Sequence, residues 1–346
     1  MTTLYLETTE HDIERAAAII KSGGLVAFPT ETVYGLGGDA LSSDASAKIY
    51  AAKGRPSDNP LIVHISDVRA LSFLASEVPW QAEKLAEAFW PGPLTMVLPK
   101  RDIVPDTTTG GLNTVAVRMP KDEAALRLIT LSGVPIAAPS ANTSQRPSPT
   151  TWEHVKHDLD GKIDAVICGK SCEGGIESTV LDMTAPDHPQ ILRPGLITPE
   201  DIGSVLGCEV TYDPAILKQP GDADPENQKL VPKAPGMKYR HYAPKAPLTI
   251  YRGADRQAVE REISERKALE EKNGKRVALL FGKAEDPQSA ARDFFAELRR
   301  IDEQDPDLIL AAALPDGDSV AFSVMNRMLK AAGYNVIEVD GRNRQV

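Results

Sequence analysis

The sequence predicts an α/β protein with two domains, the first built on a mixed sheet and the second on a smaller parallel sheet. At 346 residues the chain is longer than one typical domain. Its hydrophobic content of 42% and charged content of 25% are ordinary for a globular protein with a buried core. Short apolar runs alternate with segments of helical length through most of the chain, and this alternation is typical of α/β architectures.

The first 212 residues contain most of the predicted elements. Helices are expected near residues 9–22, 45–52, 68–73, 81–89 and 123–132. Strands are expected at residues 25–28, 61–65, 94–98, 114–118, 136–138, 165–168, 178–182 and 190–193. Because the last three strands follow one another without long helices between them, we expect a mixed sheet with antiparallel members.

Residues 213–247 differ in composition from the segments on either side. Seven prolines are spread through polar residues without sustained periodicity, which predicts a linker. Its second half, Ala234–Pro244, is rich in aromatic and cationic residues, so we expect it to dock onto another surface rather than act as a spacer.

Residues 248–346 form a regular alternation of strands and helices. Strands are expected at 248–251, 277–281, 308–313 and 335–339, and helices at 256–272, 289–302 and 319–332. The alternation predicts a small parallel sheet of Rossmann-like layout.

Charge and composition exclude several classes of protein. The formal net charge of −10 argues against general electrostatic binding of nucleic acid, although a local basic groove stays open. Three cysteines cannot form an even disulfide framework, so we expect reduced thiols. No apolar run approaches the ~20 residues that cross a bilayer, and the first residues lack the pattern of a signal peptide, so we expect a cytoplasmic protein without membrane attachment.

The most informative stretch is Pro29–Gly37, followed by Lys53–Pro60. An apolar strand leads into hydroxyls and glycines, and a helix then delivers two cations, Lys53 and Arg55, to a proline-bounded turn. The cations alone could serve to end the helix, with Gly54 as its cap. Together with the clustered donors that follow them, they favour a site for a nucleotide triphosphate.

The hydroxyls and glycines of the first motif have two interpretations. Thr30 and Thr32 could be ordinary strand residues, and Gly35 and Gly37 could serve a turn. Small ligands commonly lie beyond the strand ends of α/β sheets, so we favour a ligand role.

Other polar loops also follow predicted strands. Arg118 and Arg193 each end an apolar strand, and Pro139–Thr150 brings together hydroxyls, an amide and a guanidinium. Each could be an ordinary surface feature when taken singly. No phosphate-loop motif, dinucleotide fingerprint or nucleophile–base pair is apparent, so the pattern predicts a groove that orients substrates by placing cations.

The motifs resemble those of the YrdC-like threonylcarbamoyl-AMP synthases, in the long form with an additional C-terminal domain. The matching segments, in order, are Pro29–Gly37, Lys53–Pro60, Trp90–Thr95, Val115–Pro120, Pro139–Asn142, Glu177–Val180, Leu192–Gly195 and Ala234–Pro244. The chain departs from the family pattern at Cys168–Gly175, where the family often has Asp-Gly-Gly. The resemblance implies a twisted mixed sheet with helices around a concave groove, followed by the linker and the Rossmann-like domain.

The resemblance also implies a reaction and a set of site residues. L-threonine, bicarbonate or CO₂, and ATP would give threonylcarbamoyl-adenylate and pyrophosphate, which supplies the N6-threonylcarbamoyladenosine modification of tRNA. Threonine would be held by Thr30, His64, Arg118, the backbone of Ala138, and Ser178. ATP would be held by Lys53, Arg55, Ser57, Thr114, Ser140, Asn142, Ser148, Arg193 and, from the linker, Tyr239. Lys53 and Arg55 would be the catalytic residues, and Mg²⁺ would be held by ATP rather than by protein side chains.

Two alternatives stay open at this point. One is a non-catalytic module of the same fold that binds tRNA or double-stranded RNA, and the other is carbamoyl transfer from a different donor. The possible macromolecular partners are tRNA and the downstream threonylcarbamoyl transferase.

Overall fold

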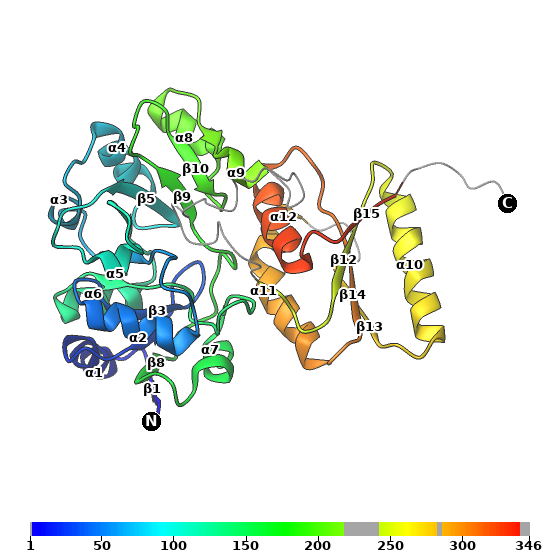
Figure 1. The fold of residues 1–346 in the computed structure, drawn as a ribbon, viewed down its shortest axis with the longest axis horizontal. Helices are drawn as coiled ribbons and strands as arrows, with labels where there is room; N and C mark the ends of the chain where they lie inside the picture. Colours follow the sequence, from blue (N-terminus) through cyan, green and yellow to red (C-terminus); the bar gives the residue numbers. More distant parts are fainter. Residues whose placement is uncertain (1, 218–241, 282–285, 340–346) are drawn as a thin grey trace. The chain divides into compact units, whose positions relative to one another are not determined.

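The computed structural model describes residues 2–217, 242–281 and 286–339 (Figure 1). The predicted mixed α/β architecture with two domains is confirmed. Contacts divide the chain into an N-terminal unit, residues 1–144 with 148–239, and a C-terminal unit, residues 145–147 with 240–346. In the described part of the chain no helix is both long and apolar enough to cross a membrane.

The N-terminal unit is built on an eleven-stranded mixed sheet in its described part. The strand order is β1-β8-β2-β3-β7-β4-β6-β5-β9-β10-β11. The strands are β1 (Leu4–Leu6), β2 (Val26–Phe28), β3 (Gly35–Asp39), β4 (Ile62–His64), β5 (Leu94–Pro99), β6 (Thr114–Arg118), β7 (Ile136–Ala137), β8 (Ala165–Ile167), β9 (Thr179–Asp182), β10 (Gln190–Arg193) and β11 (Thr211–Tyr212). Strands β4 and β6 run parallel to each other, whereas β7 and β5 on either side of them run antiparallel to them.

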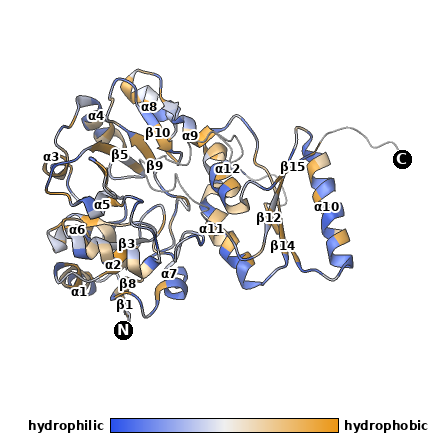
Figure 2. Cartoon of the chain, viewed as in Figure 1, coloured by the Kyte–Doolittle hydropathy of each residue, from blue (hydrophilic) through white to orange (hydrophobic). Residues whose placement is uncertain are grey.

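Helices cover the sheet and connect its strands. They are α1 (Glu10–Lys21), α2 (Ser43–Lys53), α3 (Ala70–Leu74), α4 (Trp80–Phe89), α5 (Asp106–Thr109), α6 (Glu123–Ser132), α7 (Trp152–Leu159), α8 (Pro199–Leu206) and α9 (Pro214–Leu217). Helices α1 and α6 pack on each other and on β2 and β8 in one apolar cluster, and a larger cluster contains the side chains of α4 and α8. Figure 2 shows the hydrophobic colour concentrated on β5, β9 and β10. Burial of these apolar faces provides the main driving force for folding.

Helix α2 ends where the sequence predicts. Its N-cap Ser42 accepts a hydrogen bond from the backbone N–H of Ala45, and Gly54 ends the helix in the left-handed conformation with φ +60°. This cap sets Lys53 as the last helical residue. Arg55 follows the turn.

Strand β3 is an element that periodicity does not predict. Its first four residues are Gly35, Leu36, Gly37 and Gly38, and the alternative that these glycines form a turn is wrong, because the segment pairs with β2 and β7. A Cβ on Gly37 would lie 2.7 Å from side-chain atoms of both Phe28 and Ile136. The glycine therefore permits close packing of the strand against its neighbours.

The C-terminal unit is a four-stranded parallel sheet in the order β13-β14-β12-β15. Its strands are β12 (Leu248–Arg252), β13 (Val277–Leu280), β14 (Leu308–Ala312) and β15 (Val336–Glu338), and its helices are α10 (Arg256–Lys272), α11 (Pro287–Glu303) and α12 (Ser319–Ala332). The predicted parallel sheet is confirmed for these residues. Helix α10 is mostly hydrophilic (Figure 2) and buries only a narrow stripe that includes Val259 and Ile263.

Two segments outside the regular elements join the C-terminal unit. Tyr242, just after the undescribed part of the predicted linker, packs on Phe295 with ring centroids 5.1 Å apart. Arg146 forms an ion pair with Asp302 at 2.6 Å. At the other end of the predicted linker, residues 214–217 form helix α9. The predicted linker thus contains a regular element at its start and residues that pack on the C-terminal unit at its end.

Candidate functional site

One face of the strands β4, β6, β5 and β9 carries several of the predicted site residues. The register pairs His64 with Arg118 and Ile62 with Ala116, so these four side chains point to the same side of the sheet. Thr114 lies on this side too, because it precedes Ala116 by two residues. We call this surface the β4–β6 face.

A small apolar cluster forms the floor of the β4–β6 face. It consists of Ile62, Val97, Ala116, Val180 and Leu192, which are contributed by five neighbouring strands. Polar residues lie at both ends of this floor. At ~3.3 Å per residue, Thr114 at the start of β6 and Arg118 at its end are separated by roughly 13 Å.

The end of the face where β4 and β6 stop brings together His64, Arg118, Ser178 and Arg193. The hydroxyl of Ser178 lies 2.8 Å from that of Thr95. Arg193 donates from Nη2 to the Ser178 hydroxyl and from Nε to the Ser178 carbonyl, both at 3.0 Å. Arg193, expected at ATP, therefore contacts a residue expected at threonine.

His64 is almost completely buried at this end of the face. Its ring lies edge-on to Phe28, with centroids 6.0 Å apart, and its Nδ1 is 3.2 Å from the carbonyl oxygen of Ile62. Burial, together with the nearby charge of Arg118, lowers the pKa of His64 to about 3. The imidazole is therefore neutral at physiological pH and offers a polar contact without a charge.

The lowered pKa of His64 predicts a loss of stability in acid. Above about pH 6.5 the ring is neutral in both the folded and the unfolded chain; as the pH falls below this value, only the unfolded chain gains the proton. The free energy of unfolding should therefore fall with decreasing pH, with a slope that approaches about 1.4 kcal/mol per pH unit from this group. Chemical denaturation at pH 7.5, 6 and 5 measures the free energy of unfolding. The His64→Asn variant should lack the contribution of His64 to its pH dependence.

The matched control is His188→Asn, because His188 is exposed. This variant should keep the pH dependence of the wild type. Equal slopes for His64→Asn and the wild type would contradict the assignment of a neutral, buried His64.

Arg118 is 4% exposed and lies beside a carboxylate. Its Nη2 is 2.8 Å from Oε1 of Glu31, and its Nε donates to the carbonyl oxygen of Gly92 at 3.3 Å. The other carboxylate oxygen of Glu31 accepts a hydrogen bond from the backbone N–H of Lys121 at 3.0 Å. Thus the loop after β2 reaches the end of β6.

Lys53 lies with the loop that follows β7. It is 2% exposed, and its ammonium donates to the carbonyl oxygens of Ser140 and Asn142, the latter at 2.5 Å. The Ser140 hydroxyl donates to Oδ1 of Asn142 at 2.5 Å. Three of the residues expected at ATP therefore form one cluster.

This cluster lies toward the end of the β4–β6 face where the strands begin. Ala138 donates its N–H to the carbonyl of Ile62, and β7 runs antiparallel to β4, so the chain beyond Ala138 passes the start of β4. Arg55 donates to the carbonyl oxygens of Asn59 and Pro60, directly before β4, at 3.1 Å each. Because β4 and β6 are parallel, Thr114 lies at this end as well.

The remaining predicted residues are less directly placed at the face. Thr30 uses its hydroxyl within its own loop, where it donates to the carbonyl of Val33 at 2.6 Å. Ser148 is buried and donates to Oε1 of Glu177 at 2.6 Å, whereas Ser57 is exposed. Tyr239 lies outside the described residues.

Comparisons with known proteins identify the family of this chain. A family model described as "Telomere recombination" matches residues 18–195, and one described as "Threonylcarbamoyl-AMP synthase, C-terminal domain" matches residues 197–333. The threonylcarbamoyl-AMP synthase of Pyrococcus abyssi is 47% identical over 340 residues, which cover 95% of this chain and 96% of that protein. The chain belongs to the threonylcarbamoyl-AMP synthase family.

One further relative and one solved structure match over almost the full length. The Bacillus subtilis threonylcarbamoyl-AMP synthase is 45% identical over 349 residues, covering 96% of each chain. The crystal structure of P. abyssi Sua5 complexed with L-threonine matches with a TM-score of 0.89 at 45% identity, covering 98% of this chain and 100% of that one. The family, the enzyme class and the long form predicted from the motifs are confirmed, and the non-catalytic RNA-binding alternative is not favoured.

Three residues that contact the predicted site residues of this threonylcarbamoyl-AMP synthase are not themselves predicted from the sequence. Glu31 contacts Arg118, Thr95 contacts Ser178, and Glu177 accepts the hydrogen bond of Ser148. All three lie inside motifs that carry the resemblance. Their position within a motif was therefore the one sequence feature that could have identified them. Their partners lie between 29 and 87 residues away in the sequence and cannot be inferred from spacing.

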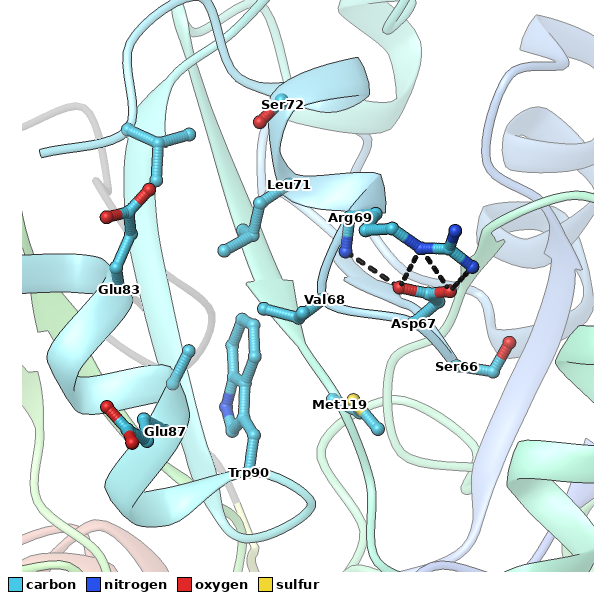
Figure 3. Close-up of a pocket in the computed structure, with 12 residues that line it drawn as sticks. Ser66, Asp67, Val68, Arg69, Leu71, Ser72, Glu83, Glu87, Trp90 and Met119 are labelled. Atoms are coloured by element: carbon cyan, nitrogen blue, oxygen red, sulfur yellow. Dashed lines mark hydrogen bonds and ion pairs between the residues drawn. The ribbon is translucent and has the colours of Figure 1, made fainter. Parts of the chain in front are cut away.

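A separate pocket of about 710 Å³ lies between α3 and α4 (Figure 3). Val68, Leu71 and Trp90 line its apolar part, and Glu83 and Glu87 of α4 are also among its lining residues (Figure 3). Its one arginine, Arg69, is paired with Asp67. The charges of this pocket do not suit the anionic substrates of a threonylcarbamoyl-AMP synthase, and no predicted site residue lines it.

Proposed function

We propose that this chain forms threonylcarbamoyl-adenylate and pyrophosphate from L-threonine, bicarbonate or CO₂, and ATP. The observation that carries the proposal is the β4–β6 face, which has a buried guanidinium, Arg118, at one end and the Lys53–Ser140–Asn142 cluster at the other. The L-threonine complex of P. abyssi Sua5, 45% identical to this chain, supports threonine as the amino-acid substrate.

Threonine would bind at the end of the face where β4 and β6 stop. The planar guanidinium of Arg118 matches the geometry of a carboxylate, which it can bind through two parallel hydrogen bonds. His64 and the Ser178 hydroxyl would contact the rest of the substrate, together with Thr30 and the backbone of Ala138. Neutral His64 would not compete for the carboxylate as a second cation.

ATP would bind toward the other end, with its phosphates near Lys53 and Arg55. Ser57, Thr114, Ser140, Asn142, Ser148 and Arg193 are the further proposed contacts. Arg193 bonds to Ser178 at the threonine end of the face, so it would contact the part of ATP nearest to threonine. Tyr239 would complete the site from the linker.

The chemistry in this arrangement needs charge compensation rather than a strong base. The amine of threonine takes up CO₂ and loses a proton, and an oxygen of the resulting carbamate attacks the α-phosphorus of ATP as pyrophosphate leaves. Two unit negative charges ~4 Å apart repel each other by about 4 kcal/mol at an effective dielectric constant of ~20. Lys53, Arg55 and Arg193 would offset this repulsion.

We further propose that Mg²⁺ enters with ATP. Within the described residues no three or more His, Cys, Asp or Glu side chains gather as a metal site. The carbonyl oxygens of Ser140 and Asn142 already accept from the Lys53 ammonium, so phosphates and water would supply the ligands of Mg²⁺. When bound, Mg²⁺ would reduce the charge of the triphosphate and of the departing pyrophosphate.

The wider setting of the reaction is also part of the proposal. Residues 1–212 would form the catalytic domain, 213–247 the linker, and 248–346 the C-terminal domain. The protein would act in the cytoplasm, and tRNA or the downstream threonylcarbamoyl transferase would receive the labile product.

Pyrophosphate release tests the proposed function. Purified protein with ATP, Mg²⁺ and bicarbonate should release pyrophosphate only when L-threonine is added. L-serine should be a poor but detectable substrate, because a methyl-sized pocket discriminates by only ~1–3 kcal/mol.

Three outcomes would contradict the proposed function. If pyrophosphate were released without threonine, the carbamate of threonine could not be the group that attacks ATP. Efficient replacement of bicarbonate by carbamoyl phosphate would favour carbamoyl transfer from another donor. Steeply salt-dependent tRNA binding without ATP turnover would instead favour the RNA-binding module.

A further inference from the structure

We propose that Glu31 is a positioning residue for L-threonine, acting through the guanidinium of Arg118. The inference rests on the proposed function, since it assigns the partner of the residue that would hold the substrate carboxylate. Glu31 lies in the loop after β2, 87 positions before Arg118, and its side chain is 11% exposed. A carboxylate and a guanidinium thus meet in a site that is almost closed to water.

The carboxylate of Glu31 is held from two sides. Oε2 accepts a hydrogen bond from the backbone N–H of Lys121 at 3.0 Å, and Oε1 lies 2.8 Å from Nη2 of Arg118. The backbone carbonyl of Glu31 also accepts from the N–H of Gly174 at 2.7 Å. The residue is therefore anchored independently of Arg118 and can act as a stationary counter-charge.

The contact between Glu31 and Arg118 is close but poorly aligned. Although the two atoms are 2.8 Å apart, neither Oε1 of Glu31 nor Nη2 of Arg118 makes a hydrogen bond of acceptable geometry within the described chain. The only hydrogen bond found for this guanidinium in the described residues is that from Nε to Gly92. Glu31 therefore compensates the buried charge while leaving N–H donors of Arg118 for a second carboxylate.

A carboxylate is the group that this position requires. An amide at the same place would have one acceptor and one donor, and both of its neighbours, the Lys121 N–H and the Arg118 guanidinium, are donors. A glutamine would therefore place its own amide NH₂ against either the Lys121 N–H or the Arg118 guanidinium, whichever way its side chain is turned. Glutamine would also remove the charge that compensates the buried guanidinium, so Arg118 should move from its position.

The test is the kinetics of Glu31→Gln. The KM for L-threonine in pyrophosphate release should rise at least tenfold, whereas the KM for ATP should stay within twofold of the wild type. Glu10→Gln is the matched control, because Glu10 pairs with Arg127 on the exposed surface at 2.9 Å. This control variant should keep both KM values.

The same substitution made in the Arg118→Lys variant distinguishes positioning of the Arg118 guanidinium by Glu31 from a general structural role of Glu31. In Arg118→Lys, the further change Glu31→Gln should raise the threonine KM by less than threefold, because its effect passes through the arginine. If Glu31→Gln does not fold, Glu31→Asp is the test variant. Its side chain keeps the charge but is one methylene shorter, so the carboxylate lies farther from Arg118. The threonine KM should rise at least fivefold.

Several results would overturn the inference. An unchanged or lower threonine KM in Glu31→Gln, or in Glu31→Asp, would show that Glu31 does not support Arg118 or competes with the substrate. Equal effects of Glu31→Gln in the wild-type and Arg118→Lys backgrounds would show an independent structural role. The wild-type requirement for threonine is measured separately, so failure of the proposed function would be recognised apart from these outcomes.

Discussion

Arg118→Lys is expected to raise the KM for L-threonine about 100-fold, which corresponds to about 2.7 kcal/mol of lost binding. Arg118 is 4% exposed and its Nε donates to Gly92, so the guanidinium is fixed before the substrate arrives. A lysine ammonium keeps the charge but cannot form two parallel hydrogen bonds to one carboxylate. Steady-state pyrophosphate release at saturating ATP measures the change.

The matched control is Arg127→Lys. Arg127 also pairs with a glutamate, Glu10, but its side chain is 38% exposed and lies on α6. Its exposed ion pair should contribute little, so all kinetic constants should stay within twofold of the wild type. A threonine KM for Arg118→Lys close to that of this control would contradict the placement of the threonine carboxylate at Arg118.

Lys53→Met is expected to lower kcat/KM for ATP by 100-fold or more. The ammonium of Lys53 is buried and donates to the carbonyl oxygens of Ser140 and Asn142. Methionine has a similar shape, but it removes a positive charge near the phosphates and leaves the two carbonyl oxygens without this donor. Initial rates at varied ATP measure the effect, and a thermal denaturation curve shows the accompanying loss of stability.

Lys48→Met on the same helix is the control for Lys53→Met. The ammonium of Lys48 donates to the carbonyl of Gly23 at 2.7 Å in an exposed position, away from the loop after β7. Its loss should leave the kinetics unchanged. If Lys53→Met and Lys48→Met had the same kcat/KM for ATP, Lys53 would have no role at the nucleotide.

Most of the fold follows from local pattern. The C-terminal unit is predicted almost element by element, because strands such as Leu308–Ala312 are short apolar runs between long amphipathic helices. In the N-terminal unit several short elements, such as β1, α5 and β11, were not predicted, and strand β3 shows why. Its glycines have no hydrophobic periodicity, and they are required by the close approach of Phe28 and Ile136, which only the assembled sheet reveals.

The candidate site is predictable in its residue types but not in its pairings. Arg118 and Lys53 stand out because each follows an apolar element within a motif. Their partners, Glu31 and the carbonyl of Asn142, are 87 and 89 residues away, and only strand register and loop packing bring them together. The same holds for Arg193, whose bond to Ser178 places it nearer the threonine end than its expected role at ATP indicates.

A crystal structure with L-threonine and a non-hydrolysable ATP analogue tests the central claim most directly. We expect both oxygens of the threonine carboxylate within hydrogen-bonding distance of the Arg118 guanidinium, at the end of the β4–β6 face. The triphosphate should contact Lys53 and Arg55, with its α-phosphorus toward the threonine amine. Threonine bound away from Arg118, or phosphates without contact to Lys53 and Arg55, would contradict the account.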